Sequence, residues 1–177
     1  VHDFALIFAA AERMLVSDPD VVFMIVGQGP RKSDLERVAR EKKLDNVRFY
    51  PYAPYEQLSE SLSLADLAFV TLERGFEGVI APGKIYAYLA VGAPVVLIQG
   101  SASDLSRIVE DGIEGTIVAP HDVEGFCRYV RALKSDSTRR REARVKNRAW
   151  YDRSCDFENN GRRFIDVFQR LLSSRCL

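Results

Sequence analysis

The feature that most limits how this chain can fold is its alternation of short apolar segments with segments of helical periodicity. Residues 21–27 form a continuous apolar run rich in β-branched side chains, which predicts a strand buried on both faces. Further strand-like segments lie at 46–52, 66–72, 94–98 and 115–120. Strands that alternate with helices form βαβ units, so the sequence predicts an α/β, Rossmann-like fold. Its sheet should be mostly parallel, with helices on both faces and right-handed crossovers.

The remaining segments place the helices and the extent of the domain. Apolar side chains at helical spacing predict helices at 4–15, around 35–39, from Pro54 to 65, after Pro82, around 105–109, at 123–133 and at 157–172. Residues 137–154 are also expected to be helical, although they are barely amphipathic. The length of 177 residues favours one domain, with a core at 1–135 and closing helices at 136–177.

Composition excludes several classes of protein. The net charge is zero, so the chain as a whole offers no attraction to nucleic acid. Three cysteines lie far apart without a Cys-x-x-Cys pair, which argues against a disulfide framework or a zinc site and fits a reducing cytosol. No apolar run is long enough to span a membrane, and the first residues lack signal-peptide features. We therefore expect a cytoplasmic protein without a metal.

The first candidate ligand loop follows the strand at 21–27. In an open parallel sheet, ligands bind beyond the carboxyl ends of the strands. Gly27 and Gly29 would allow a ligand close to the backbone there, with Pro30 and Arg31 after them. An ordinary tight turn into a helix is an equal interpretation. Lys32 stands where a dinucleotide fingerprint needs a third glycine, so a nicotinamide dehydrogenase is disfavoured.

The second candidate is a helix start at 82–84. Pro82 suits the first helical position, and Gly83 leaves the next amide uncovered. Lys84 brings an ammonium to the positive end of the helix, where a cation alone is unfavourable by ~0.3–1 kcal/mol. A bound anion between the amides and the ammonium would make this arrangement favourable, so we interpret it as a phosphate site. The alternative is a lysine that points into water.

Other features are less specific. The loop 73–81 is either a segment that folds over a ligand or a solvated connection. His2 and His121 belong to no ligand-spaced cluster, and Ser101, Ser103 and Asp104 are expected to cap the following helix. The basic run at 139–148 is interpreted as a solvated helix face or as a contact for a membrane surface or an anionic partner.

Taken in order, these motifs resemble a known family. The stretches "DPDVVFMIVGQGPRKSDLERVAREKKLDNVRFYPYAPYEQL", "GVIAPGKIYAYLAVGAPVV" and "IVEDGIEGTIVAPHD" look like the C-terminal, nucleotide-sugar-binding domain of group-1 retaining glycosyltransferases with the GT-B architecture. The likeness covers about residues 1 to 135. The Pro-x-Lys helix start is similar to that of the subgroup that makes surface polysaccharides.

The resemblance implies a function and a set of site residues. It implies the donor-binding half of a hexosyltransferase that moves a sugar from a nucleoside diphosphate to a lipid-linked or polysaccharide acceptor, without a cofactor. Lys84 would neutralise the leaving diphosphate. Carried over residue by residue, the donor-binding set is Gly27, Gly29, Arg31, Tyr52, Ala53, Pro54, Pro82, Gly83 and Lys84, with the turn 52–54 beside the base.

The chain also departs from the family pattern. The two glutamates of a Glu-x7-Glu motif would fall on Val79 and Ala87, and Gly83 replaces the serine of Pro-Ser-Lys. The family's donor half begins with a strand and a glycine-rich loop before the helix at 4–15, and an acceptor-binding half precedes it. We therefore expect a fragment, a truncated product or one subunit that needs an acceptor-binding partner. Without the central strand, 21–27 either pairs with 66–72 or leaves a gap.

Two alternatives remain open from the sequence. One is a non-catalytic subunit that binds a nucleotide or a partner protein. The other is a fragment of a nucleotide-sugar epimerase, which shares the two-lobed fold. Peripheral association with the inner face of a membrane is a further expectation.

Overall fold

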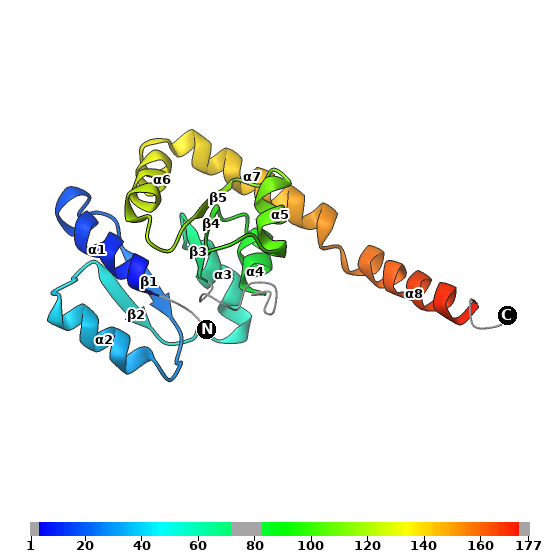
Figure 1. Cartoon of the computed structure of the whole chain (residues 1–177), viewed down its shortest axis with the longest axis horizontal. Coiled ribbons are helices and arrows are strands. Elements are labelled where there is room, and N and C mark those ends of the chain that lie inside the picture. The colour runs from blue at the N-terminus through cyan, green and yellow to red at the C-terminus, as the bar shows by residue number, and fades with distance from the viewer. Residues whose placement is uncertain (1–3, 72–82, 174–177) are drawn as a thin grey trace.

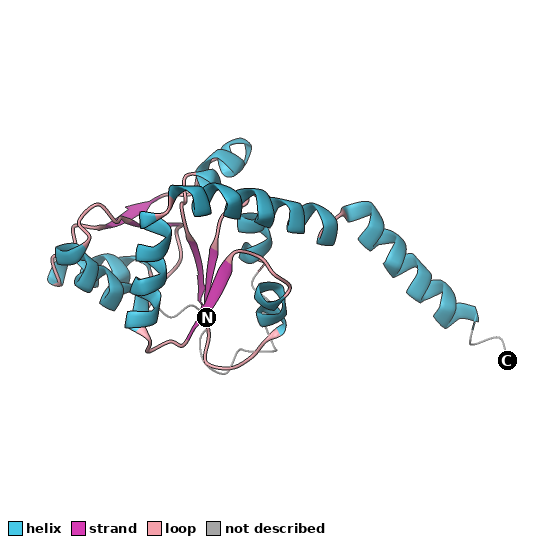
Figure 2. Ribbon diagram, turned by 90° about the horizontal axis from the view of Figure 1, so that it is seen from above, coloured by secondary structure: helices cyan, strands magenta, loops and turns pink. Residues whose placement is uncertain are grey.

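The computed structural model describes residues 4–71 and 83–173, and the predicted alternation of helices and strands is present there (Figure 1). The strands are β1 (Phe23–Val26), β2 (Val47–Tyr50), β3 (Ala68–Thr71), β4 (Val95–Ile98) and β5 (Gly115–Val118). The helices are α1 (Ala5–Ser17), α2 (Lys32–Glu41), α3 (Leu58–Ser63), α4 (Lys84–Ala90), α5 (Asp104–Glu110), α6 (Val123–Ser135), α7 (Ser137–Ser154) and α8 (Phe157–Ser173), with a 3-10 turn, η1 (Tyr55–Gln57), before α3. Figure 2 shows the helices arranged around the strands.

All strand pairs in the described residues are parallel, as predicted, but they form two separate sheets. One sheet has the order β1-β2 and the other β3-β4-β5. β1 therefore does not pair with β3, and of the two outcomes expected for residues 21–27 the structure shows the gap. Helices pack on both sheets, so the fold is the expected Rossmann-like arrangement with an interruption at its centre (Figures 1 and 2).

The expectation that residues 21–27 are buried on both faces is wrong. Phe23 is buried and Ile25 is half-buried, but the side chains that alternate with them are open: Met24 is 39% exposed and Val26 43%. The buried face packs against α1 and α2 in one apolar cluster. A continuous apolar run shows that a strand can be buried on both faces, but whether a second layer covers it depends on the tertiary structure.

α1 joins the two sheets. Six of its side chains are buried, and the apolar cluster they belong to contains Phe23 of β1 as well as Val96 and Val118 of the other sheet. α6 packs against α1, and the ring of Phe126 stacks on that of Phe23 at 6.3 Å between centroids. Helix packing therefore supplies the connection that strand pairing does not.

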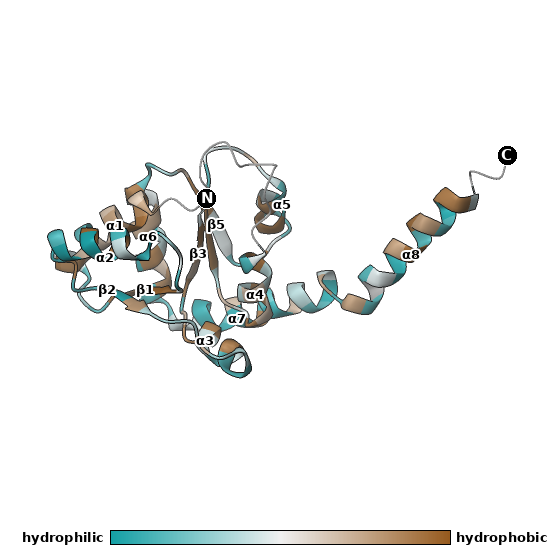
Figure 3. Cartoon of the chain, turned by 90° about the horizontal axis from the view of Figure 1, so that it is seen from below, coloured by the Kyte–Doolittle hydropathy of each residue, from teal (hydrophilic) through white to brown (hydrophobic). Residues whose placement is uncertain are grey.

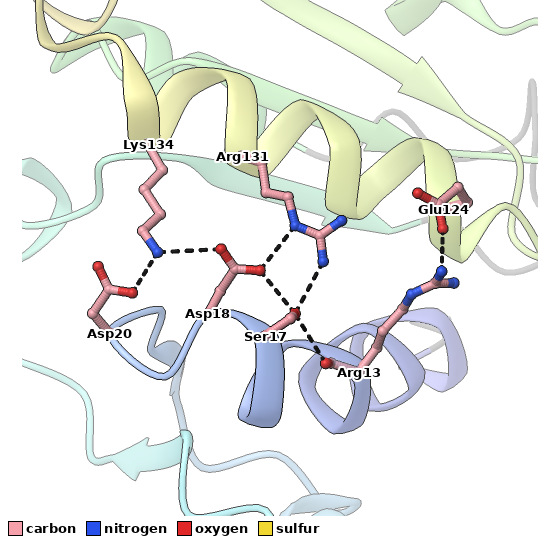
Figure 4. A network of polar contacts seen from close by, with 7 residues as sticks. All are labelled: Arg13, Ser17, Asp18, Asp20, Glu124, Arg131 and Lys134. Carbon is pink, nitrogen blue, oxygen red and sulfur yellow. Dashed lines mark hydrogen bonds and ion pairs between the residues drawn. The ribbon is translucent and has the colours of Figure 1, made fainter.

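A polar network fixes the contact between α1 and α6 (Figure 4). Asp18 follows α1 and is buried; its carboxylate accepts from Arg131 Nε at 2.8 Å and from Lys134 Nζ at 3.2 Å. The hydrogen bond from Arg131 is the largest cause that lowers the pKa of Asp18 to about 2. Arg13 of α1 also forms an ion pair with Glu124 of α6. These ion pairs fix the position of α1 relative to α6.

α7 closes the three-stranded sheet. Trp150 belongs to the second apolar cluster, with residues of β3, β4, α4 and α5. Asn147 is fully buried: its Nδ2 donates to Ala93 O at 2.9 Å and Glu114 O at 3.0 Å, and its Oδ1 accepts from Glu114 N at 2.6 Å. Gly92 has φ +75°, and a side chain there would collide with the backbone carbonyl of Arg144.

The basic run on α7 is mainly structural, which corrects the interpretation of a simple solvated face. Arg139 pairs with Glu114 at 2.6 Å, and Arg140 donates to Leu133 O and Lys134 O in the last turn of α6. Arg144 donates to Ser63 O and Ala65 O, and Arg148 donates to Ala90 O. Carbonyls at helix C-termini lack helical partners, so these guanidinium groups cap α3, α4 and α6.

α8 extends away from the rest of the molecule (Figures 1 and 3). It is amphipathic, and Figure 3 shows a brown apolar side along it. Its exposed apolar residues are Phe157, Phe164, Ile165, Val167, Phe168, Leu171 and Leu172. Within the ranges that the structure describes, no helix is long and apolar enough to cross a membrane.

Candidate functional site

The candidate site is built from segments that follow β1 and β2 and from the beginning of α4. In Figure 1 the chain leaves β1 and β2 at the lower edge of the molecule, and α4 begins at that edge. This is the carboxyl side of the parallel strands, where ligands bind in open α/β sheets. The placement agrees with the sequence expectation for the loops at 27–31 and 52–54.

Gly27 and Tyr52 come together at this edge. Gly27 has φ +146° and donates its N–H to Tyr50 O at 3.0 Å. A Cβ placed on Gly27 would lie 3.3 Å from Tyr52 Oη, so the phenol ring rests beside the glycine backbone. Tyr52 is 68% exposed. The pair therefore presents an accessible aromatic surface next to a backbone that has no side chain of its own.

The neighbouring predicted residues form the turns that lead into α2 and η1. Gly29 is exposed, and its carbonyl accepts from Lys32 N at 3.0 Å. Arg31 is the exposed N-cap of α2. Ala53 is half-buried, while Pro54 is exposed and precedes η1. These residues thus lie at the predicted turns, and Arg31 and Pro54 sit directly before a helix.

α4 starts two residues later than predicted at the Pro-Gly-Lys segment. Gly83 is the N-cap and Lys84 is the first helical residue, and both are exposed. Pro82, predicted at the first helical position, lies outside the described residues, as does the loop 73–81. No hydrogen bond or ion pair of the exposed Lys84 side chain is present among the described residues.

Sequence reasoning missed a buried polar cluster at the end of β4. Gln99 is buried; its Nε2 donates to Ser106 Oγ at 2.5 Å, and its Oε1 accepts from Ser103 Oγ at 2.8 Å. Ser103 is the N-cap of α5, as expected. A polar residue directly after an all-apolar strand was the available signal. Because the three side chains satisfy one another, this cluster fixes the start of α5 and does not offer free groups to a ligand.

Two shallow hollows in the described residues lie elsewhere. One is lined by Asp18, Arg128, Arg131 and Lys134 on the α6 side, and the other lies on α8. Among the described residues, no group of His, Cys, Asp and Glu could hold a metal ion. Of the predicted residues, the structure brings Gly27 and Tyr52 into contact, and it leaves the Tyr52 ring and the side chain of Lys84 exposed.

Known proteins show a clear relationship to this chain. Residues 3–150 match the family model described as glycosyl transferases group 1. The chain is 32% identical over 165 residues to a protein named for colanic acid biosynthesis, the glycosyl transferase WcaI of Escherichia coli (strain K12), covering 90% of this chain and 38% of that protein. It is 30% identical over 153 residues to the GDP-mannose-dependent alpha-(1-6)-phosphatidylinositol monomannoside mannosyltransferase of Mycolicibacterium smegmatis, covering 84% of this chain and 40% of that enzyme.

The fold also matches solved structures. A mutant of S. aureus TarM in complex with fondaparinux, alpha-GlcNAc-glycerol and UDP superimposes with a TM-score of 0.78 at 20% identity, over 94% of this chain and 33% of that chain. The chain thus spans less than half the length of these relatives. The family model covers most of the sequence, and the chain belongs to the group-1 glycosyltransferases.

Proposed function

We propose that residues 1–177 form a donor-binding domain of a glycosyltransferase, which holds a nucleoside-diphosphate sugar at the carboxyl edge of its strands. The observation that carries this proposal is the family match over residues 3–150. The relatives supply the substrate class: one is named as GDP-mannose-dependent and a structural neighbour was solved with UDP. The acceptor would be a polysaccharide or a lipid-linked sugar, in line with the names of WcaI and the mannosyltransferase.

The proposed donor site uses the predicted residues. The exposed ring of Tyr52, with Ala53 and Pro54, would border the base, and Gly27 and Gly29 would let the nucleotide approach the backbone. Arg31 would lie at the rim of the site, at the start of α2.

Lys84 is the proposed catalytic residue. As the bond from the sugar to the diphosphate breaks, negative charge develops on the leaving phosphate oxygens. The exposed Lys84 ammonium and the backbone N–H groups that follow Gly83, at the start of α4, would stabilise that charge without a metal. Pro82 belongs to the same proposed segment.

An acceptor-binding partner would complete the site. In this proposal the described residues would form one wall of it, and α8 would offer its exposed apolar side to the partner. We propose that α8 packs against the acceptor-binding domain or subunit, because burial of Phe164, Phe168 and Leu171 would be favourable in a protein interface.

The charges of the chain offer little attraction to a membrane surface. The basic run is largely occupied by internal hydrogen bonds. The polar side of α8 mixes Arg162, Arg163 and Arg170 with Glu158 and Asp166, so its attraction to anionic lipid is small. Co-sedimentation with anionic vesicles should leave most of the chain in the supernatant; recovery in the pellet that is lost on truncation after Asp156 would support a membrane role for α8.

Calorimetric titration with UDP and with GDP tests the donor site. We expect one of the two nucleotides to bind. Lys84→Ala should cost ~3 kcal/mol of binding free energy, as for removal of an oxyanion donor, which weakens the affinity by ~100-fold or more. Lys146→Ala, which removes another exposed ammonium, is the matched control and should leave the affinity unchanged. Equal affinity of the Lys84→Ala variant and the unmodified chain would show that the assigned site is wrong.

A further inference from the structure

The short helix α4, which begins with Lys84, packs against α7 (Figure 3). α4 has only 7 residues, and isolated helices this short are at best marginally stable in water. Its position therefore depends on contacts with the rest of the chain. We propose that Arg148 of α7, oriented by Asp152, is a positioning residue for the Lys84 ammonium. This inference rests on the proposed function, because that function assigns Lys84 to the donor diphosphate.

Side chains of α7 bind the carbonyl groups at the end of α4. Arg148 Nη1 donates to Ala90 O at 2.8 Å, and Asn147 Nδ2 donates to Ala93 O at 2.9 Å just beyond the helix. The last carbonyls of a helix have no partner within it, so the bond from Arg148 replaces a missing one. A cation at a helix C-terminus also interacts favourably with the helix dipole. Arg148 therefore stabilises α4 at the end where its own hydrogen bonds stop.

The Arg148 guanidinium is itself fixed in orientation. Its Nε donates to both carboxylate oxygens of Asp152 at 2.9 Å, and the group lies 5.9 Å from the centre of the Tyr151 ring. Because a guanidinium is planar and rigid, a contact at Nε determines the direction in which Nη1 points. That direction is toward Ala90 O. Asp152 thus sets the geometry of the bond from α7 to α4.

The contact at the end of α4 affects Lys84 because the helix is short and packed along one side. Ile85 and Leu89 are fully buried in the apolar cluster that also contains Trp150 of α7. Apolar contacts determine which side of α4 is buried, but they are not directional. The hydrogen bond from Arg148 is directional, so it limits how far α4 slides or rotates on that cluster. Lys84 directly precedes Ile85, so its ammonium moves with any shift of the helix.

Arg140 offers a matched control, because it makes the same kind of contact with another helix. Its Nη1 donates to Leu133 O and Lys134 O in the last turn of α6. Neither carbonyl belongs to α4 or to the proposed donor site. Arg140→Ala therefore removes a guanidinium cap from α7 without touching α4, and an effect that only Arg148→Ala produces is specific to α4.

Amide hydrogen exchange measured by NMR on the whole chain tests whether Arg148 holds α4. In Arg148→Ala, the Tyr88 and Leu89 amides inside α4 should exchange about 10-fold faster, because a hydrogen bond from a charged group is lost. Arg140→Ala should leave these amides unchanged. Asp152→Asn keeps the guanidinium but weakens its orientation, so it should act in the same direction by less. It also provides the comparison if Arg148→Ala does not fold.

Titration with UDP and with GDP tests the link from α4 to the donor site. The affinity for the nucleotide that binds should fall by about 10-fold in Arg148→Ala and stay unchanged in Arg140→Ala. Arg148→Lys keeps a cation and a donor but not the planar fork, so it should restore part of the affinity.

Phosphorus NMR at saturating nucleotide separates positioning from a general loss of stability. The signal of the terminal phosphate should move in Arg148→Ala, because the ammonium beside it is displaced. A variant that is only less stable would give the signal of the unmodified chain once the nucleotide is bound.

Two results would overturn the inference. One is equal exchange of the α4 amides in Arg148→Ala and Arg140→Ala. The other is faster exchange in Arg148→Ala with unchanged nucleotide affinity and phosphorus signal, while Lys84→Ala still weakens binding. Failure of the unmodified chain to bind UDP or GDP would refute the proposed function, and with it the role of Lys84, whereas the exchange rates would still show whether Arg148 holds α4.

Discussion

At the scale of single residues, Gly27 links sequence and site most directly. Its φ of +146° lies where a side chain is strained, and a Cβ would also press on the Tyr52 phenol. Both effects follow from the turn after β1 that brings the loops of β1 and β2 together. The glycine is therefore required by the local backbone, whatever ligand the edge binds.

Gly27→Ala should destabilise the chain by about 1–3 kcal/mol, because the residue must adopt a strained conformation and displace Tyr52. Urea unfolding measures this loss. Gly29→Ala is the matched control: its φ is not in the left-handed region and nothing lies within 4 Å of the added Cβ. If both variants lose the same stability, the special role of Gly27 is refuted. The proposed donor site further requires that Gly27→Ala weaken nucleotide binding more than Gly29→Ala does.

At the scale of elements, α7 holds the three-stranded sheet and its helices in place. Its arginines cap the ends of other helices, Asn147 joins the segments before β4 and β5, and Trp150 fills the second apolar cluster. α8 differs, because its large apolar side chains are exposed. The two closing helices thus have different roles.

Asn147→Ala should cost about 3 kcal/mol, because it leaves the Glu114 N–H and the Ala93 carbonyl without their partner. The free energy of unfolding in urea gives the value. The adjacent exposed residue provides the control, since Lys146→Ala should change stability by less than about 0.5 kcal/mol. A loss for Asn147→Ala as small as that of the control would contradict the conclusion that α7 holds the three-stranded sheet and its helices in place.

At the scale of the whole molecule, the contact between α1 and α6 substitutes for strand pairing between the sheets. The Asp18 network lies at that contact (Figure 4). The folded pKa of Asp18, about 2, lies below its ordinary value of 3.8. The ionised Asp18 carboxylate therefore makes its full contribution to the free energy of unfolding above about pH 4, and this contribution is lost as the pH falls through about 2.

The difference in unfolding free energy between the unmodified chain and Asp18→Asn should reach about 2 kcal/mol at pH 6 and shrink toward zero near pH 2. Urea titrations at several pH values provide the measurement. Asp45→Asn removes an exposed carboxylate that forms no ion pair in the described residues, and it should show no such trend. A pH-independent difference for Asp18→Asn would mean that the network does not stabilise the contact electrostatically.

The sequence by itself determined the order and type of the elements and the family. Strand segments alternate with helices at the expected places because period-two and period-3.6 patterns are local properties. The turns at Gly27, Tyr52 and Gly83 were also identifiable, because glycine and proline restrict the backbone locally. The expected pairing of Gly83 and Lys84 with a phosphate and the assigned donor residues remain predictions.

Only the tertiary structure decided the long-range relations. The exposure of Met24 and Val26, the contact of Tyr52 with Gly27 and the internal use of the α7 arginines depend on which elements pack together. The spacing of apolar residues along the chain reveals which of them share one face of a helix or strand, but not which element covers that face. The split into two sheets has the same cause: strand pairing is a contact between distant segments, and the unpaired edges of β1 and β3 become visible only when all the strands are in place.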